Sequence, residues 1–149
     1  MSADSITNFI ESIETVINWA RDALQDDGYW NRVERIDNYS WDEVYKVLAY
    51  AQVPSCVVVY KGGRYQNQPR AKRSFSVFVA EREWRNKNDA ERRMSEIVDK
   101  VIGILDHELA LDSDGVATTA LVRVVSDTYI PLKWSGVTAY EIAFEVEDY

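Results

Sequence analysis

Residues 53–84 read VPSCVVVYKGGRYQNQPRAKRSFSVFVAEREW: an apolar segment, a basic segment with two glycines, and a second apolar segment. Pro54 stops any preceding helix, and the three valines that follow are typical of a strand buried on both faces. Residues 65–69 are polar and non-periodic, so the connection is too long for a two-residue hairpin. Alternation of apolar and polar side chains in 73–82 predicts a longer strand that returns beside the first.

The flanking sequence predicts three helices and two more strands. Apolar residues recur every three or four positions in 5–25 and again in 88–110, which predicts two long amphipathic helices. A capping box beginning at Ser40 predicts a short helix between them. β-Branched and aromatic residues predict strands over 118–126 and 138–147.

This order, α-α-β-β-α-β-β, predicts an α+β protein. We expect a single domain, residues 1–149, with one mostly antiparallel (mixed) β-sheet and the two long helices packed on one face. The residues of the last strand that are expected to face the core are Tyr140, Ile142, Phe144 and Val146. Those expected to face outward, on one surface, are Glu141, Glu145 and Glu147.

The charge of the chain is unevenly distributed. The sequence contains 17 Lys and Arg and 25 Asp and Glu, a formal net charge of −8. Generic nucleic-acid binding is disfavoured, because it depends on neutralising phosphates. Residues 44–80, however, contain no Asp or Glu, and their basic residues are Lys46, Lys61, Arg64, Arg70, Lys72 and Arg73. The basic segment 61–73 is expected to dock onto an acidic surface of a neighbouring subunit rather than to touch nucleic acid, unless it is only a solvated hairpin tip.

Residues that could carry catalysis or bind a metal are sparse. His107 is the only histidine, which disfavours both a zinc site built on a histidine pair and a catalytic triad. Cys56 lies among valines, which raise the pKa of a thiol rather than lower it. The Asp-x-Asp-Gly sequence at 112–115 lacks the other calcium ligands and predicts a plain turn. No cofactor is expected.

The element order is also compatible with a nuclease core, whose metal ligands are acids on adjacent strands. The first strand falls in the acid-free segment 44–80, and the second offers only Glu81 and Glu83 at its end. We therefore expect the protein not to be an enzyme.

Aromatic residues are concentrated between positions 29 and 50. Such side chains are enriched at protein interfaces together with arginine, although they would serve equally as a small core under the first connection. The candidate interface residues are Trp30, Trp41, Lys61, Gly62, Gly63, Arg64, Tyr65, Arg70, Lys72 and Arg73.

Residues 53–65, the returning residues 73–82 and the helix beginning near Asp89 resemble the Mu-like prophage tail-assembly family. The final strand, from Gly136 to Val146, is similar to the ending of that family, and the order of elements resembles that of phage tail terminator proteins. The resemblance extends from about Ser5 to Val146. It rests on apolar patterning, a glycine-containing hairpin and a Gly-x-x-x-Tyr start to the last strand.

The resemblance implies a structural protein without an active site. Tail terminators cap the growing tail tube as a ring, typically a hexamer, and present a surface to the head. The implied partners are the chain's own copies, the tail tube and head-completion proteins, with DNA only as passing cargo and no membrane. In such a ring, a lumen face formed by Glu141, Glu145 and Glu147 would repel the phosphate backbone.

The resemblance further implies that the protein resides in the host bacterial cytoplasm during assembly and then in the tail of the virion. The N-terminal residues lack a basic segment followed by a long apolar one, so no signal peptide is expected. The alternative is a small regulatory or nucleic-acid-handling protein that contacts its partner through residues 61–73.

Overall fold

The computed structural model describes residues 3–36, 39–50, 53–64, 72–82, 87–130 and 137–147. Within these residues, helices and strands follow in the order α1 (Ala3–Asp26), β1 (Arg32–Ile36), α2 (Trp41–Tyr50), β2 (Ser55–Arg64), β3 (Lys72–Arg82), α3 (Lys87–Leu105), β4 (Leu109–Leu111), β5 (Ala117–Ile130) and β6 (Val137–Glu147). In this described part of the chain, no helix is both long and apolar enough to cross a membrane.

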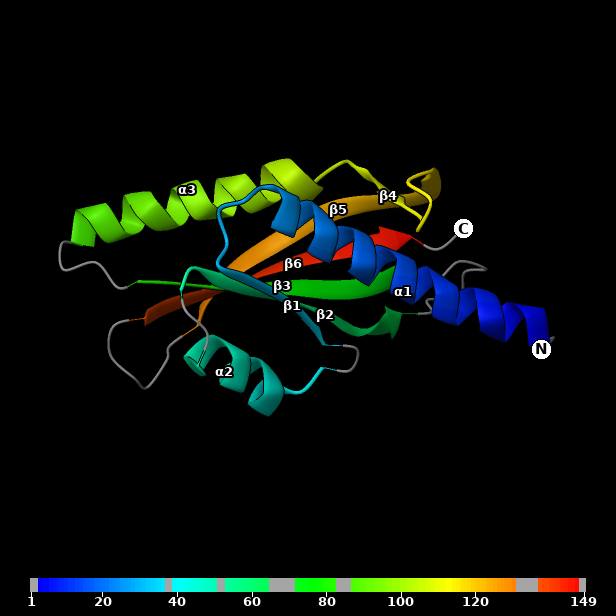
Figure 1. Ribbon diagram of the computed structural model, residues 1–149, viewed down its shortest axis with the longest axis horizontal. Helices are drawn as coiled ribbons and strands as arrows, with labels where there is room; N and C mark the ends of the chain where they lie inside the picture. The colour runs from blue at the N-terminus through cyan, green and yellow to red at the C-terminus, as the bar shows by residue number, and fades with distance from the viewer. Residues whose placement is uncertain are drawn as a thin grey trace.

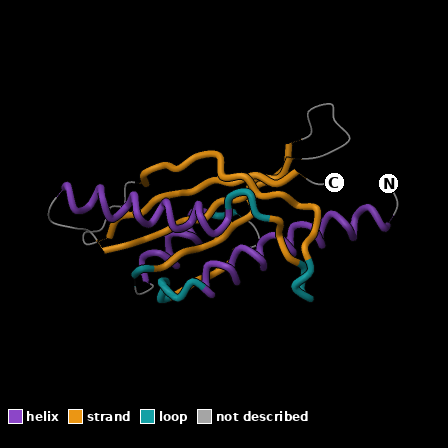
Figure 2. The backbone as a smooth tube through the Cα atoms, turned by 90° about the horizontal axis from the view of Figure 1, so that it is seen from above, coloured by secondary structure: helices purple, strands orange, loops and turns teal. Residues whose placement is uncertain are grey.

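The six strands form one sheet in the order β1-β2-β3-β6-β5-β4. β1 runs parallel to β2, and the other neighbouring pairs are antiparallel. α1 and α3 lie on one side of the sheet and α2 on the other (Figure 1). Seen from above, the N-terminal end of α1 extends past the strands (Figure 2). We call the side under α1 and α3 the covered face and the side that carries α2 the open face.

The covered face holds the main hydrophobic core. Alternate side chains of each strand point into it, because successive residues of a strand face opposite sides of the sheet. At its centre Phe75 of β3 stacks on Phe144 of β6, with ring centroids 5.2 Å apart. Other buried members of this core are Val16, Ile17, Ala20, Leu24, Cys56, Val58, Val77, Val79, Met94, Ile97, Val101, Leu105, Val122, Ile142 and Val146.

A smaller core lies under α2 on the open face. Val44 and Leu48, four residues apart on one side of α2, pack against Val57, Val59 and Phe78 of the sheet. β2 is therefore covered on both faces, and residues 55–59 are fully buried. The prediction that this strand is buried on both faces is confirmed. On the open face it is α2 that buries it.

The prediction of an α+β protein with a single sheet is confirmed, but the predicted order lacks two strands. β1 reads Arg-Val-Glu-Arg-Ile and is a strand through its pairing with β2. The helix predicted to reach residue 110 ends at Leu105. His107 then adopts a φ of 60°, and residues 109–111 pair with β5 as β4. The apolar residues after Leu105 thus belong to a strand, although their spacing also fits a helix.

Candidate protein-interaction surface

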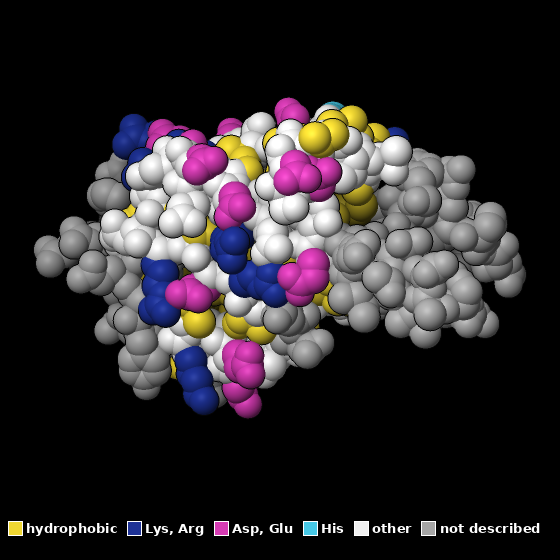
Figure 3. Space-filling view, turned by 45° about the vertical axis from the view of Figure 1, so that its right-hand side comes forward, with side chains coloured by type: hydrophobic (Ala, Val, Ile, Leu, Met, Phe, Trp, Pro, Cys, Tyr) yellow, Lys and Arg dark blue, Asp and Glu magenta, His cyan; other side chains and the backbone are white. Residues whose placement is uncertain are grey.

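Beyond α2, the open face is formed by alternate residues of β3, β6 and β5. The strand register places Lys72 opposite Glu147, and it places Glu145 between Ser74 and Arg123. At these two positions an acidic residue of β6 therefore lies opposite a basic residue of one neighbouring strand. Figure 3 shows a similar mixture over one side of the molecule, where Lys and Arg side chains lie among Asp and Glu. Mixed charge of this kind is suited to contacts with another protein rather than with a polyanion.

Lys61, Glu141 and Ser76 form a polar network on the open face. Lys61 Nζ donates a hydrogen bond to Glu141 Oε2 at 2.8 Å. The buried hydroxyl of Ser76 donates to the same oxygen at 2.7 Å. The Lys61 ammonium also lies 4.8 Å from the ring centroid of Tyr39, a cation–π contact. The network ties β2, β3 and β6 to the residues that precede α2.

The basic segment continues β2 and β3 at both of its ends. In the ladder Gly63 pairs with Arg73, and Arg64 pairs with Lys72. The register shifts between Tyr60 and Gly62, where Gly62 has a φ of 127° that a residue with a Cβ rarely adopts. Both ends of the basic segment therefore belong to the sheet, and residues 65–71 lie outside the described part of the chain.

The described cations of the basic segment are engaged within the chain. Lys61 belongs to the network above. Arg73 is only 3% exposed, so the prediction that it is a docking residue is wrong. Lys72 and Arg73 both interact with other groups of the chain. The remaining candidates of the loop itself, Tyr65 and Arg70, lie outside the described residues.

Glu141 and Glu145 alternate along β6 with residues of the core, as predicted, whereas the side chain of Glu147 lies outside the described part of the structure. The strip that they form is nevertheless not uniformly acidic. Glu141 accepts a hydrogen bond from Lys61 of β2, two strands away, and the strand register sets Arg123 of β5 beside Glu145 and Lys72 of β3 opposite Glu147.

The two tryptophans proposed for an interface lie in or against the two cores. Trp30 is 8% exposed and contacts the ring of Tyr29 edge to face, with centroids 4.9 Å apart. Trp41 packs on Phe78 at 5.9 Å. Trp30 is therefore a core residue and the interface prediction for it is wrong. Among the described aromatic side chains of this region, Tyr39 is exposed, and its ring stacks on Phe78 at 6.1 Å.

A second polar network lies at the edge of the covered face. The hydroxyl of Tyr29 donates to Glu81 Oε2, and Arg93 of α3 donates to the same hydroxyl at 2.8 Å. Burial, and next the hydrogen bond to Glu81, raise the pKa of Tyr29 to about 12. Glu81 was considered from the sequence as a possible metal ligand of a nuclease. In the structure it joins β3, α3 and the segment before β1. The other candidate, Glu83, lies outside the described residues.

Other groups considered for chemistry occupy structural positions. Burial raises the pKa of the Cys56 thiol, which opposes formation of a reactive thiolate. His107 lies in the turn after α3 with its side chain 74% exposed. Asp112 Oδ1 accepts the backbone N–H groups of Asp114 and Val116, both at 2.9 Å, which is the predicted plain turn. In the described ranges, no three His, Cys, Asp or Glu residues are grouped to hold a metal ion.

Exposed apolar side chains gather at the β4–β5 edge of the sheet, a feature not predicted from the sequence. Leu109 and Leu111 are exposed on either side of the buried Ala110. Further along β5, Val125 and Tyr129 are more than half exposed, at 52% and 56%. The turn sequence Asp-Ser-Asp-Gly, between two apolar segments, is the signal that identifies a hairpin here in retrospect.

The outer edge of β5 is paired along only part of its length. Val122 exchanges backbone hydrogen bonds with residues 107 and 108, and Asp106 Oδ1 accepts the Val124 N–H at 2.8 Å. Within the part of the chain that the structure describes, β5 has no strand beside this edge from Val125 to Ile130. Such an edge presents unpaired backbone groups to a partner.

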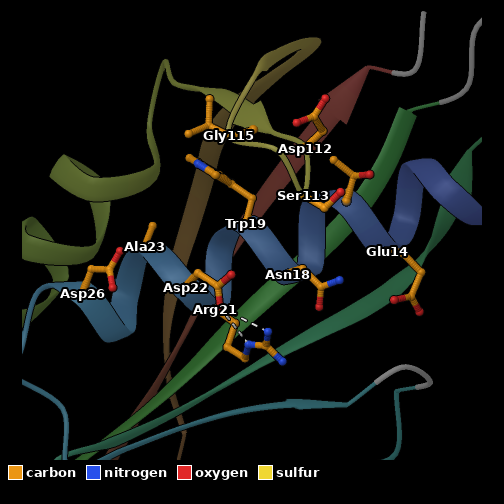
Figure 4. A pocket seen from close by; sticks show the side chains of 12 residues that line it. Glu14, Asn18, Trp19, Arg21, Asp22, Ala23, Asp26, Asp112, Ser113 and Gly115 are labelled. Atoms are coloured by element: carbon orange, nitrogen blue, oxygen red, sulfur yellow. Dashed lines mark hydrogen bonds and ion pairs between the residues drawn. The ribbon is translucent and has the colours of Figure 1, made fainter.

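An open groove lies between α1 and the β4–β5 turn (Figure 4). Trp19 points from α1 toward the turn at Gly115. Trp19, Ala23 and Leu111 give the groove apolar lining. Its charged lining residues are Glu14, Arg21, Asp22, Asp26 and Asp112.

No family model matches this sequence, and no curated protein matches it. One solved structure, of a protein named only by a number, aligns with 100% of this chain and 98% of its own, at 12% identity and a TM-score of 0.40. Similarity of that degree carries no functional argument.

Proposed function

We propose that this chain is a non-enzymatic structural protein of a phage or prophage tail, which caps the tail tube as a ring of its own copies and forms the head–tail junction. The sequence resemblance of residues 53–65, of residues 73–82 and of the last strand to tail-assembly and tail terminator proteins suggests the class. The protein would act in the host cytoplasm during assembly and remain in the virion tail.

The observation that best supports this proposal is the combination of the open face with the β4–β5 edge. On the open face Arg123 lies opposite Glu145 in the strand register and Lys61 is bonded to Glu141, so this face offers both signs of charge to a neighbour. The edge adds exposed apolar side chains, such as Val125 and Tyr129, beside unpaired backbone. Apolar contact surrounded by paired charges is typical of protein interfaces.

The net charge of −8 agrees with DNA as a passing cargo. A ring of such subunits carries the same sign as the phosphate backbone, so DNA would move through it without adhering. The repulsion would come from the whole subunit rather than from the glutamates of β6 alone, because those glutamates have basic neighbours.

The alternative is a regulatory or nucleic-acid-handling protein that uses residues 61–73. The engagement of Lys61 with Glu141 weighs against it, because a phosphate contact would have to replace an existing ion pair.

Mass in solution, with and without a tail-tube protein, tests the proposal. Native mass spectrometry is expected to give multiples of 17.2 kDa, and electron microscopy is expected to show rings, free or at the end of tubes. A protein that remains monomeric in both conditions and binds single-stranded or duplex DNA would support the alternative and overturn the proposal.

A further inference from the structure

We propose that the groove between α1 and the β4–β5 turn receives residues 64–71 of a second copy of this chain. The inference rests on the self-assembly proposed above and names a contact that would drive it. It starts from the chemistry of the groove, which combines apolar lining with an excess of carboxylates.

Two of the carboxylates are already compensated. Both oxygens of Glu14 accept hydrogen bonds from Arg35 at 2.9 Å, and these bonds hold the pKa of Glu14 below its ordinary value. Arg21 pairs with Asp22 at 3.1 Å. These pairs leave the excess negative charge of the groove on its other acids.

Asp26 and Asp112 carry this excess. Neither has a cationic partner among the described residues. Asp26 belongs to the last turn of α1, where the negative end of the helix dipole adds to its charge. Asp112 stands across the groove, on the β4–β5 turn (Figure 4). The groove therefore offers two separated carboxylates with the apolar side chain of Trp19 in its lining.

Residues 64–71 have the complementary chemistry. They read RYQNQPRA, with an arginine at each end of a Tyr- and Pro-containing segment and no acid. Arg64 and Arg70 match the two carboxylates in number and sign, and Tyr65 is suited to the apolar lining. The segment belongs to the β2–β3 connection, whereas the groove belongs to α1 and the β4–β5 turn.

A contact between two different surfaces of the same protein is heterologous. Each copy then offers one groove and one segment, so copies add head to tail and close into a ring when the rotation between them permits. The contact is electrostatic in part, and self-association is expected to weaken as salt rises.

The first test neutralises the groove. Asp26→Asn and Asp112→Asn are combined, because asparagine at 112 keeps the oxygen that accepts the turn's N–H groups. The dissociation constant for self-association, measured by analytical ultracentrifugation, is expected to rise about fivefold, the loss expected for two exposed charge pairs. Asp99→Asn, which removes an exposed carboxylate from α3, is the matched control and is expected to leave the constant unchanged.

The second test traps the contact. Asp112→Cys and Arg70→Cys variants are mixed under oxidation, and a disulfide between two copies is expected. The native Cys56 is fully buried and does not compete. In a chain that carries both substitutions, a disulfide formed only within one copy would overturn the inference.

The outcomes separate this inference from the proposed function. Self-association that is unchanged by Asp26→Asn/Asp112→Asn, together with no disulfide between copies, would overturn the groove contact and leave ring assembly standing. A wild-type chain that is monomeric with and without a tail-tube protein would overturn both.

Discussion

Each face of the sheet carries a carboxylate that joins three segments of the chain, but the two lie at different depths. On the covered face, the side chain of Glu81 is 7% exposed and accepts a hydrogen bond from Tyr29. On the open face, Glu141 is 21% exposed and accepts from Lys61 and Ser76. A buried polar network costs more to break than an exposed one, because its members cannot turn to water. The covered face is thus expected to hold the fold, and the open face is expected to remain accessible to a partner.

The largest difference is expected between the buried centre of the covered face and the exposed part of β5. Phe144→Ala empties the centre of the covered core, where the ring stacks on Phe75, and is expected to lower the free energy of unfolding by about 3–5 kcal/mol. Ser126→Ala on the exposed part of β5 is the matched control, with an expected change within about 0.5 kcal/mol. Urea denaturation measures both, and equal losses would contradict the distinction between the two faces.

The two carboxylates give the next largest difference. Glu81→Gln replaces a buried charged acceptor and is expected to lower the free energy of unfolding by about 2 kcal/mol. Glu141→Gln, the same substitution on the open face, is expected to cost about 0.5 kcal/mol, because its partner Lys61 is partly solvated. The same denaturation experiment compares them. A larger loss for Glu141→Gln would reverse the roles assigned to the two networks.

Titration of Tyr29 sharpens the description of the covered network. Its pKa in the folded chain is about 12, against an ordinary value of 10.0, because burial and then Glu81 disfavour the phenolate. The unfolded chain therefore loses this proton first as pH rises. Stability from this effect is complete below about pH 10 and is lost as pH rises toward 12.

Tyr29→Phe removes this contribution to the pH dependence. Unfolding curves collected between about pH 9 and 11 are expected to show a smaller decline in stability for the variant than for the wild type. Identical declines would indicate that Tyr29 ionises with its ordinary pKa. Spectrophotometric titration of the phenol provides an independent measurement.

The smallest effect is expected where α1 meets β1. Glu14→Gln weakens the pair with Arg35, and Glu14 is largely exposed, so a change of at most about 0.5 kcal/mol in the free energy of unfolding is expected. Glu14 titration by NMR is the more sensitive measurement, because its pKa is expected below the ordinary value and is expected to return to that value in Arg35→Met.

The parts of the fold that were predicted correctly depend on local pattern. Alternation in 73–82 and in the last strand assigned the faces of β3 and β6, because side chains in a strand alternate whatever lies beside it. β1 and β4 were missed because their strand character depends on distant partners. Five residues that pair with β2, and three that pair with β5, carry no periodic pattern long enough to recognise.

In the candidate surface, too, local pattern predicted which way a side chain faces but not which distant residue it contacts. Alternation placed Glu141 on the outward surface, but its partner Lys61 is 80 residues away in the chain, and no spacing rule joins them. Trp30 was proposed for an interface because it belongs to the aromatic cluster between positions 29 and 50, and aromatic side chains are enriched at protein interfaces. It is buried by residues that come from other elements, which a single sequence does not bring together.

Hydrogen–deuterium exchange of dilute and self-associated protein tests the central claim most directly. If the open face and the β4–β5 edge form the assembly surface, peptides covering residues 109–130 are expected to exchange more slowly after association. Peptides from α3 are expected to exchange at an unchanged rate. Association with no slowing of exchange in residues 109–130 would contradict the account, because the copies would then meet through another surface.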